Sequence, residues 1–250
     1  MSEMNNHNEE VGMDEEIVET GAISKLVNIV IAPSKALKGI KVKPNLIIPM
    51  ILVVLVPVIY YIAFWSSIEM QMIRTIEAQF EVQGQEVTQE LLDLSLGLAR
   101  WGTPLMVVFT TLIAGLISGT YYFICAKMAE STLTFKQSMS IAYHVMVISL
   151  FSWILMMVLT IVGIDFIQEV PMTSLASLLP DSMNTTFLYG LALPIEVFSI
   201  WGSVVTYFAL RIVAEMSKKS AMISVIVAFL IGMFLSAGSY ILASLVNTIG

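Results

Sequence analysis

The sequence predicts an all-α polytopic membrane protein: a bundle of five transmembrane helices with an amphipathic helical hairpin on its outer side. Hydrophobic residues make up 57% of the 250 residues and charged residues only 12%, and the mean hydropathy is +0.86. Soluble domains are far less apolar. Five apolar stretches have about the 20 residues that one membrane crossing needs. Lys and Arg also gather in alternate loops, as expected of a multi-pass chain.

The first 43 residues form two segments of opposite charge. Residues 1–20 carry seven acidic residues and no apolar periodicity, which predicts a disordered acidic cytoplasmic tail. Residues 21–43 carry five lysines among apolar residues at helical spacing. This pattern predicts a basic amphipathic cytoplasmic segment, which either lies on an anionic membrane surface or only flanks the first span. The polar, acidic start does not have the order of a cleavable secretory signal.

Residues 44–250 are predicted to form the membrane domain. Ten of the 12 Lys and Arg residues precede the first span or fall in the loops on the same side, and only Arg74 and Arg100 fall in the opposite loops. The positive-inside rule then places the N-terminus in the cytoplasm and the C-terminus outside. The expected spans are Leu46–Trp65, Pro104–Ala126, Met139–Gly163, Phe187–Arg211 and Ala221–Val246.

The first outer loop, Ser66–Gly102, is long enough to contain structure. It shows two apolar stripes at helical spacing, separated by a break at Gln83–Gln85, and acidic residues between them. Two short amphipathic helices with acidic polar faces are therefore expected. The hairpin either lies over the bundle and the outer leaflet or serves as a docking surface for a partner.

Glu196 is the residue of the fourth span that most needs an explanation. Counting about 1.5 Å per residue from Phe187, it lies roughly 13 Å below the membrane surface. A charge at that depth costs roughly 2.5–3.5 kcal/mol on insertion scales. Pro194, two positions earlier, removes a helical hydrogen-bond donor and favours a kink.

Three further polar residues accompany Glu196 in the candidate site. Ser199 and Ser203 share its helical face at steps of three and four residues, and His144 lies within the third span. One interpretation is a relay for protons or cations past Glu196. The other is a hydrogen-bonded, neutral glutamate that joins helices, because desolvation favours the neutral carboxyl.

Small residues recur at helical spacing in two spans. Gly115 and Gly119 form a GxxxG pattern in the second span, and Gly232 and Ser236 begin a similar stripe in the fifth. Such stripes let helices approach closely. They pack the bundle internally or mark a seam between two copies of the chain, so a homo-oligomer stays open.

The sequence contains no pattern typical of catalysis. We find no phosphate-binding glycine loop, no metalloprotease motif and no nucleophile elbow, and the chain has two histidines and one cysteine, Cys125. The charge pattern also lacks a nucleic-acid footprint. We therefore expect no enzyme activity, no cofactor, no metal and no nucleic-acid partner.

The fourth span contains the most specific motif of the chain. The run PIEVFSIW at residues 194–201, followed by two lysines and a final hydrophobic span, resembles the signature of the bacterial branch of the Yip family of Rab/Ypt-interacting membrane proteins. That signature usually has Asp where this chain has a glutamate. The residues that carry the resemblance are Glu196, Phe198, Trp201, Lys218 and Lys219.

Two other stretches fit the same family. Ala32–Leu37, with Pro33, resembles the family's cytoplasmic entry motif, and Phe135–Gln137 with Ala142–Tyr143 resembles the segment that enters its third span. The resemblance implies five spans, a cytoplasmic N-terminus, a plasma-membrane location and an accessory role beside other membrane machinery.

The expected function is that of a non-enzymatic accessory or scaffold protein. Its partners would be the lipid bilayer and another membrane protein or complex, with an exporter as one candidate. The alternative is a small transporter or channel that uses the intramembrane Glu196.

Overall fold

The computed structural model describes residues 21–82, 84, 86–163, 172–183 and 186–249. Within these residues the chain folds into α-helices joined by turns and short 3₁₀ helices. The predicted disordered tail at residues 1–20 lies outside them. The α-helices are α1 (Ala22–Ile31), α2 (Pro33–Val42), α3 (Ile47–Ala63), α4 (Trp65–Val82), α5 (Gln89–Met128), α6 (Phe135–Met146), α7 (Leu150–Ile161), α8 (Phe187–Ala192), α9 (Val197–Ile212) and α10 (Lys218–Ile249), and the 3₁₀ helices are η1 (Val147–Ser149), η2 (Leu175–Leu178) and η3 (Asp181–Met183).

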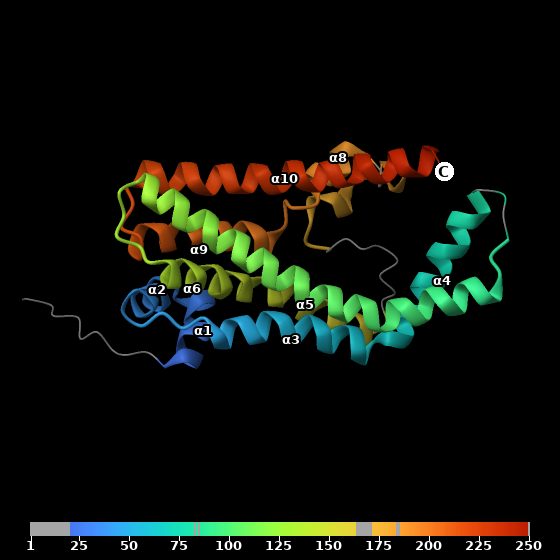
Figure 1. Cartoon of the computed structure of the whole chain (residues 1–250), viewed down its shortest axis with the longest axis horizontal. Coiled ribbons are helices and arrows are strands. Elements are labelled where there is room, and N and C mark those ends of the chain that lie inside the picture. Colours follow the sequence, from blue (N-terminus) through green and yellow to red (C-terminus); the bar gives the residue numbers. More distant parts are fainter. Residues whose placement is uncertain (1–20, 83, 85, 164–171, 184–185, 250) are drawn as a thin grey trace, which may run out of the picture.

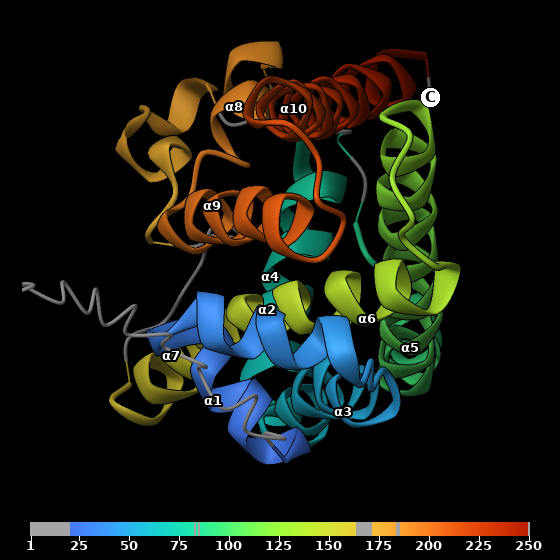
Figure 2. The same cartoon turned by 90° about the vertical axis from the view of Figure 1, so that its left-hand side faces the viewer.

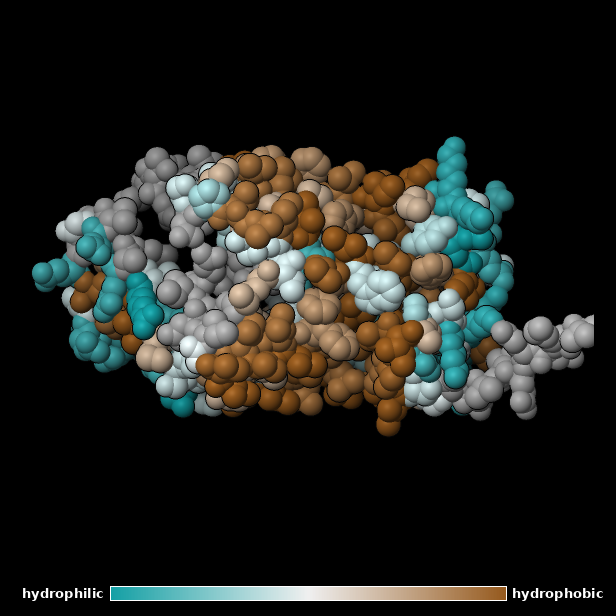
Figure 3. Space-filling view, turned by 180° about the vertical axis from the view of Figure 1, so that it is seen from behind, coloured by the Kyte–Doolittle hydropathy of each residue, from teal (hydrophilic) through white to brown (hydrophobic). Residues whose placement is uncertain are grey.

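The long helices lie side by side along the long axis of the molecule (Figure 1). Viewed from behind, the surface shows a hydrophobic band between two hydrophilic ends (Figure 3). Three helical stretches are long and apolar enough to cross a membrane, and α3 with the first part of α4 makes a fourth if this pair, bent by 74°, is one span. These features confirm the prediction of an all-α polytopic membrane protein. The three unbent candidates are Gln89–Met128, Phe135–Ile161 and Lys218–Leu242.

The expected fourth span is discontinuous. Helix α8 has six residues and α9 has 16, and the chain between them is not helical. A helix of 16 residues is about 24 Å long, less than the roughly 30 Å of a hydrocarbon core. The count of five continuous spans therefore stays a prediction.

The expected helical hairpin is present, but its second arm is longer than expected. The chain turns at Gly84, whose φ of +68° suits glycine. Thr88 then caps α5 by accepting a hydrogen bond from the Leu91 amide at 3.3 Å, and α5 continues for 40 residues into the second span. Pro104 lies inside this helix. It removes one backbone donor but does not end the helix, so the second arm of the hairpin and the expected second span form one helix rather than two.

The basic segment 21–43 packs into the bundle. On α2, the side chains of Ala36, Leu37 and Ile40 are fully buried among residues of α6 and α9. Helix α1 is tied to the end of α2, because the buried Lys25 donates a hydrogen bond to the Lys43 carbonyl at 2.6 Å. Whether this segment also lies on a membrane surface stays a prediction.

The outward face of the same segment divides into two parts. Helix α1 exposes Ile23, Val27 and Ile31 at four-residue spacing, so its outward stripe is apolar. Helix α2 exposes lysines, of which Lys41 contacts Glu215 with its Nζ 2.5 Å from the Glu215 Oε1. The hydrogen bond and charge of Lys41 hold the pKa of Glu215 below its usual range.

Three glycines are placed where two helices meet. A Cβ at Gly115 would lie 2.4 Å from the Tyr143 ring, and one at Gly119 would lie 2.4 Å from the Met139 sulfur. These two glycines therefore let α5 contact α6 within one chain. A Cβ at Gly190 of α8 would lie 2.5 Å from the Ala237 Cα of α10.

The small-residue stripe that begins with Gly232 and Ser236 lies on α10, and of these two only Ser236 is close to another helix. The Ser236 carbonyl would lie 3.1 Å from a Cβ at Gly190, whereas a Cβ at Gly232 would have no heavy atom within 4 Å. Gly232 is exposed. The close contact between α8 and α10 is therefore made at Gly190 of α8, and Gly232 of α10 does not take part in it.

This difference gives a matched pair of variants. We expect Gly190→Ala to lower the free energy of unfolding by about 1–3 kcal/mol, because the added methyl group meets backbone atoms that cannot move aside easily. Gly232→Ala should be neutral or stabilising by up to about 1 kcal/mol, since alanine favours a helix. Thermal unfolding in detergent micelles, followed by circular dichroism, measures both. Equal melting temperatures for the two variants would contradict the α8–α10 contact.

Candidate functional site

The candidate site lies at the break between α8 and α9. Pro194 has no backbone N–H, so it cannot continue the hydrogen-bond pattern of α8. Glu196 then adopts an extended conformation, with φ −126° and ψ 148°, before α9 begins. The segment that follows the third span satisfies the exposed backbone: the Leu175 amide donates to the Ile195 carbonyl at 2.8 Å, and Ser174 forms an isolated bridge with Glu196.

The Glu196 side chain joins segments that are distant in sequence. Its Oε1 accepts a hydrogen bond from the Ser152 hydroxyl of α7 at 2.5 Å and one from the Thr173 hydroxyl at 3.0 Å. Ser174 adds a third link, because its hydroxyl donates to the Leu193 carbonyl at 2.8 Å. The carboxylate thus connects α7, the 172–175 segment and the start of α9.

The hydroxyls of Ser199 and Ser203 form hydrogen bonds with backbone groups at and near the start of α9 and do not form a polar stripe that is free to bind a solute. The Glu196 amide donates to the Ser199 hydroxyl at 3.2 Å, and that hydroxyl donates to the Pro194 carbonyl at 2.5 Å. The Ser203 hydroxyl donates to the Ser199 carbonyl one turn earlier, at 2.9 Å. Ser199 therefore fixes the first turn of α9 as an N-terminal cap does.

His144 is separate from Glu196. It lies on α6 with 1% of its surface exposed, and its Nδ1 is 2.7 Å from the Ser140 carbonyl. Its Nε2 has no hydrogen-bond partner among the described residues. The hydroxyl partners of Glu196 are instead Ser152 and Thr173. Sequence reasoning missed both, although a serine within an apolar span is a usable signal for a helix-to-helix hydrogen bond.

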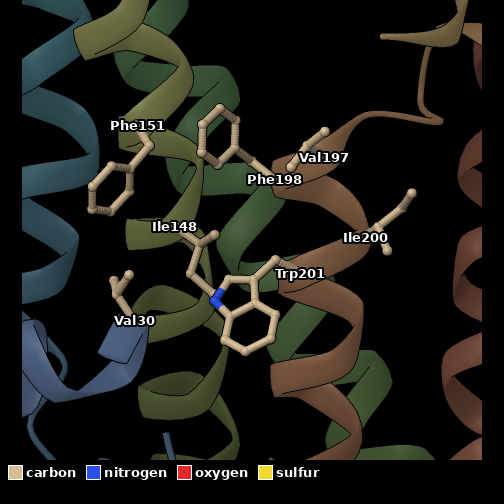
Figure 4. A pocket seen from close by; sticks show the side chains of 7 residues that line it. All are labelled: Val30, Ile148, Phe151, Val197, Phe198, Ile200 and Trp201. Atoms are coloured by element: carbon tan, nitrogen blue, oxygen red, sulfur yellow. The ribbon is translucent and has the colours of Figure 1, made fainter. Parts of the chain in front are cut away.

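The motif aromatics line an apolar groove on the side of the bundle (Figure 4). Phe198 and Trp201 of α9 face Ile148 and Phe151 across it, and Val30 of α1 lies at one end. The groove has a volume of about 390 Å³, and all its lining residues are apolar.

The other motif residues lie at the end of the molecule that carries the lysines. Pro33 is the first residue of α2, where proline is favoured because that N–H has no helical partner. Lys218 and Lys219 begin α10 and are exposed. Within the described residues, no group of three or more His, Cys, Asp or Glu side chains could hold a metal ion.

These features define the class of protein: a helical integral membrane protein in which the hydrogen-bonded side chain of Glu196 bridges the break between α8 and α9 to α7. Residues 27–239 match the Yip1 domain, so the chain belongs to this family, as its motifs predict. No curated protein and no solved structure matches the chain.

The hydrogen bonds of Glu196 can be tested by replacing it with two residues. Glu196→Gln keeps a side-chain oxygen that accepts from Ser152, so we expect it to lower the free energy of unfolding by less than about 1 kcal/mol. Glu196→Ala leaves the hydroxyls of Ser152 and Thr173 without their acceptor and should cost about 1–3 kcal/mol.

Unfolding by titration with a denaturing detergent measures both losses. A double-mutant cycle with Ser152→Ala then isolates the coupling between the two side chains. If Glu196→Gln is as damaging as Glu196→Ala, an amide cannot replace the carboxyl group and the structural interpretation fails.

Proposed function

We propose that this protein is a non-enzymatic accessory or scaffold protein that binds or regulates another complex in the plasma membrane, with an exporter as one candidate. We further propose that its N-terminus is cytoplasmic and that the outer hairpin faces the opposite side. Membership of the Yip1 family supports a membrane role without catalysis. The observation that carries the proposal is the shape and surface of the hairpin.

The hairpin consists of α4, the turn at Gly84 and residues 89–102 of α5. It extends beyond the end of the bundle (Figure 1). On its α5 arm, the side chains of Leu94 and Leu98 are 61% and 67% exposed and lie one helical turn apart. Exposed apolar residues at this spacing suit a contact with another helix or with a lipid surface.

Charge favours a protein partner over an anionic lipid surface. The exposed acidic residues outnumber the two basic ones, Arg74 and Arg100, and acidic side chains repel anionic headgroups. A partner with a basic and apolar patch on the same side of the membrane would be complementary. The exposed acidic residues are Glu77, Glu81, Glu86, Glu90 and Asp93.

We expect the tagged protein to retain a membrane partner in near-stoichiometric amount when it is purified from its native membrane in a mild detergent. Exchanging Glu86 and Glu90 for lysine should reduce this recovery at least about tenfold, because like charges then oppose docking. Glu130→Lys is the control, since Glu130 is exposed at the other end of α5. Quantitative mass spectrometry of the eluate measures the recovery. A protein that elutes alone, or a partner insensitive to both changes, would contradict the proposal.

The second candidate function is transport of a proton or solute past Glu196. The break between α8 and α9 favours it, because transporters often bind substrates at interrupted helices. In liposomes, this function predicts a pH-dependent flux that Glu196→Gln abolishes, since an amide carries no titratable proton. Absence of flux with the purified protein, or an unchanged flux in Glu196→Gln, counts against it.

A further inference from the structure

The apolar groove is lined by none of the hairpin residues and does not include the side chain of Glu196. Its walls come from α9 on one side and from η1 and α7 on the other (Figure 4). The Phe151 and Phe198 rings stack across it, with centroids 6.0 Å apart and planes 20° apart. The groove opens sideways, because Ile200 and Trp201 on its rim are 47% and 37% exposed. An opening of this kind in a membrane-crossing bundle meets hydrocarbon.

The volume and lining suit a chain of methylene groups. About 390 Å³ falls within the range of small-molecule sites, and no lining residue is polar. Trp201 has a rigid ring at the rim, which gives a passing acyl chain a fixed surface to pack on.

The change from apolar to charged exposed side chains between α1 and α2 indicates the depth at which a lipid headgroup would lie. Ile31, next to Val30 of the groove, is apolar and 73% exposed, so it suits the acyl layer. Lys35, four residues later on the first turns of α2, is exposed and charged. The boundary between the acyl and headgroup layers therefore falls between these two residues, at the end of the groove that Val30 lines.

Charge selects the kind of headgroup. Ten of the 12 Lys and Arg residues lie in residues 21–43, 127–136 and 211–219. These segments comprise α1, α2 and the α5–α6 and α9–α10 connections with the helix ends that flank them, and they gather at one end of the molecule (Figure 1). Among the described residues of these segments, the acidic ones are Glu130 and Glu215, and Lys41 pairs with the second. These segments therefore carry a net positive charge beside the end of the groove that Val30 lines, and this charge attracts an anionic headgroup.

We propose that this groove binds one acyl chain of an anionic glycerophospholipid from the leaflet next to α2, with the headgroup held beside Lys35. The site uses residues of two family-like motifs, because Lys35 belongs to the entry motif and Phe198 and Trp201 belong to the fourth-span motif. It does not depend on the accessory function proposed above.

Trp201 is a built-in reporter for this site. The full chain with Trp65, Trp101 and Trp153 replaced by phenylalanine retains Trp201 as its sole tryptophan. In vesicles, phospholipids with brominated acyl chains quench this residue on contact. The measurement compares brominated phosphatidylglycerol with brominated phosphatidylcholine at equal mole fraction and gives their relative binding constants at Trp201.

We expect phosphatidylglycerol to be preferred by about fivefold, the preference that one lysine near the surface supplies. Lys35→Gln should reduce the preference to near one. Lys136→Gln is the matched control: this exposed lysine lies on the first turn of α6, which crosses the lysine-bearing end from α5 toward α7 (Figure 2). It should leave the preference unchanged.

A second variant tests the groove itself. Ile200→Phe fills the rim at an exposed position, so the fold should survive and the quenching by both lipids should fall. Equal quenching by both lipids in the parent chain would overturn the proposal, because ordinary lipid contact would explain it. A preference that persists in Lys35→Gln, or that Lys136→Gln removes equally, would also overturn it. Absence of quenching by either lipid would show that protein covers the groove.

Discussion

The rest of this structure depends on how the chain satisfies the backbone at the break in the fourth apolar stretch. Unpaired N–H and C=O groups cannot be left facing hydrocarbon, so an interruption needs partners within the protein. Here the 172–175 segment returns to pair with Ile195 and Glu196, and Ser152 and Thr173 bind the carboxylate. Pro194 thus ends the hydrogen-bond pattern of α8, Ser199 fixes the first turn of α9, and Glu196 connects this break to α7 and to the 172–175 segment.

The starting point of α9 also decides what its first turn exposes. Phe198 and Trp201 are three residues apart, so they share one face of the helix, and this face lines the apolar groove. Glu196 bonds inward to α7. The alternation of Glu, Phe, Ser and Trp in the motif is thus the pattern of a helix start: polar positions close the break, and aromatic positions form the wall of the groove. A continuous helix from Phe187 would have no need for the polar positions.

Local patterns in the sequence predict the apolar helices and the turn at Gly84, because hydropathy, helical period and turn residues act over a few neighbouring positions. They do not reveal pairs that only the fold brings together. Ser152 and Glu196 are 44 positions apart, and nothing near Ser152 distinguishes it from other serines in spans. Gly232 and Gly190 illustrate the same limit of sequence patterns. The spacing of small residues shows where a second helix could pack closely, but only the fold shows that a helix does so at Gly190 and not at Gly232. The continuity of α5 through Gly102 and Pro104 is a further case, because both residue types are common in turns, but one missing donor does not end a helix.

The contacts at the break between α8 and α9 indicate whether Glu196 could change position, as a transport mechanism would require. A carrier needs two arrangements of similar free energy between which the site alternates. Moving α9 relative to α7 would separate Glu196 from the Ser152 hydroxyl of α7. Moving α8 would also disturb the contact of Gly190 with Ala237, which leaves no room for even a methyl group. Loss of each of these contacts would leave a buried polar group without a partner or create a cavity, and both changes raise the free energy of the rearranged state. A protein that keeps this break fixed and binds a partner through its groove or hairpin loses none of these contacts. This difference in free energy is the physical reason to favour the accessory function over transport.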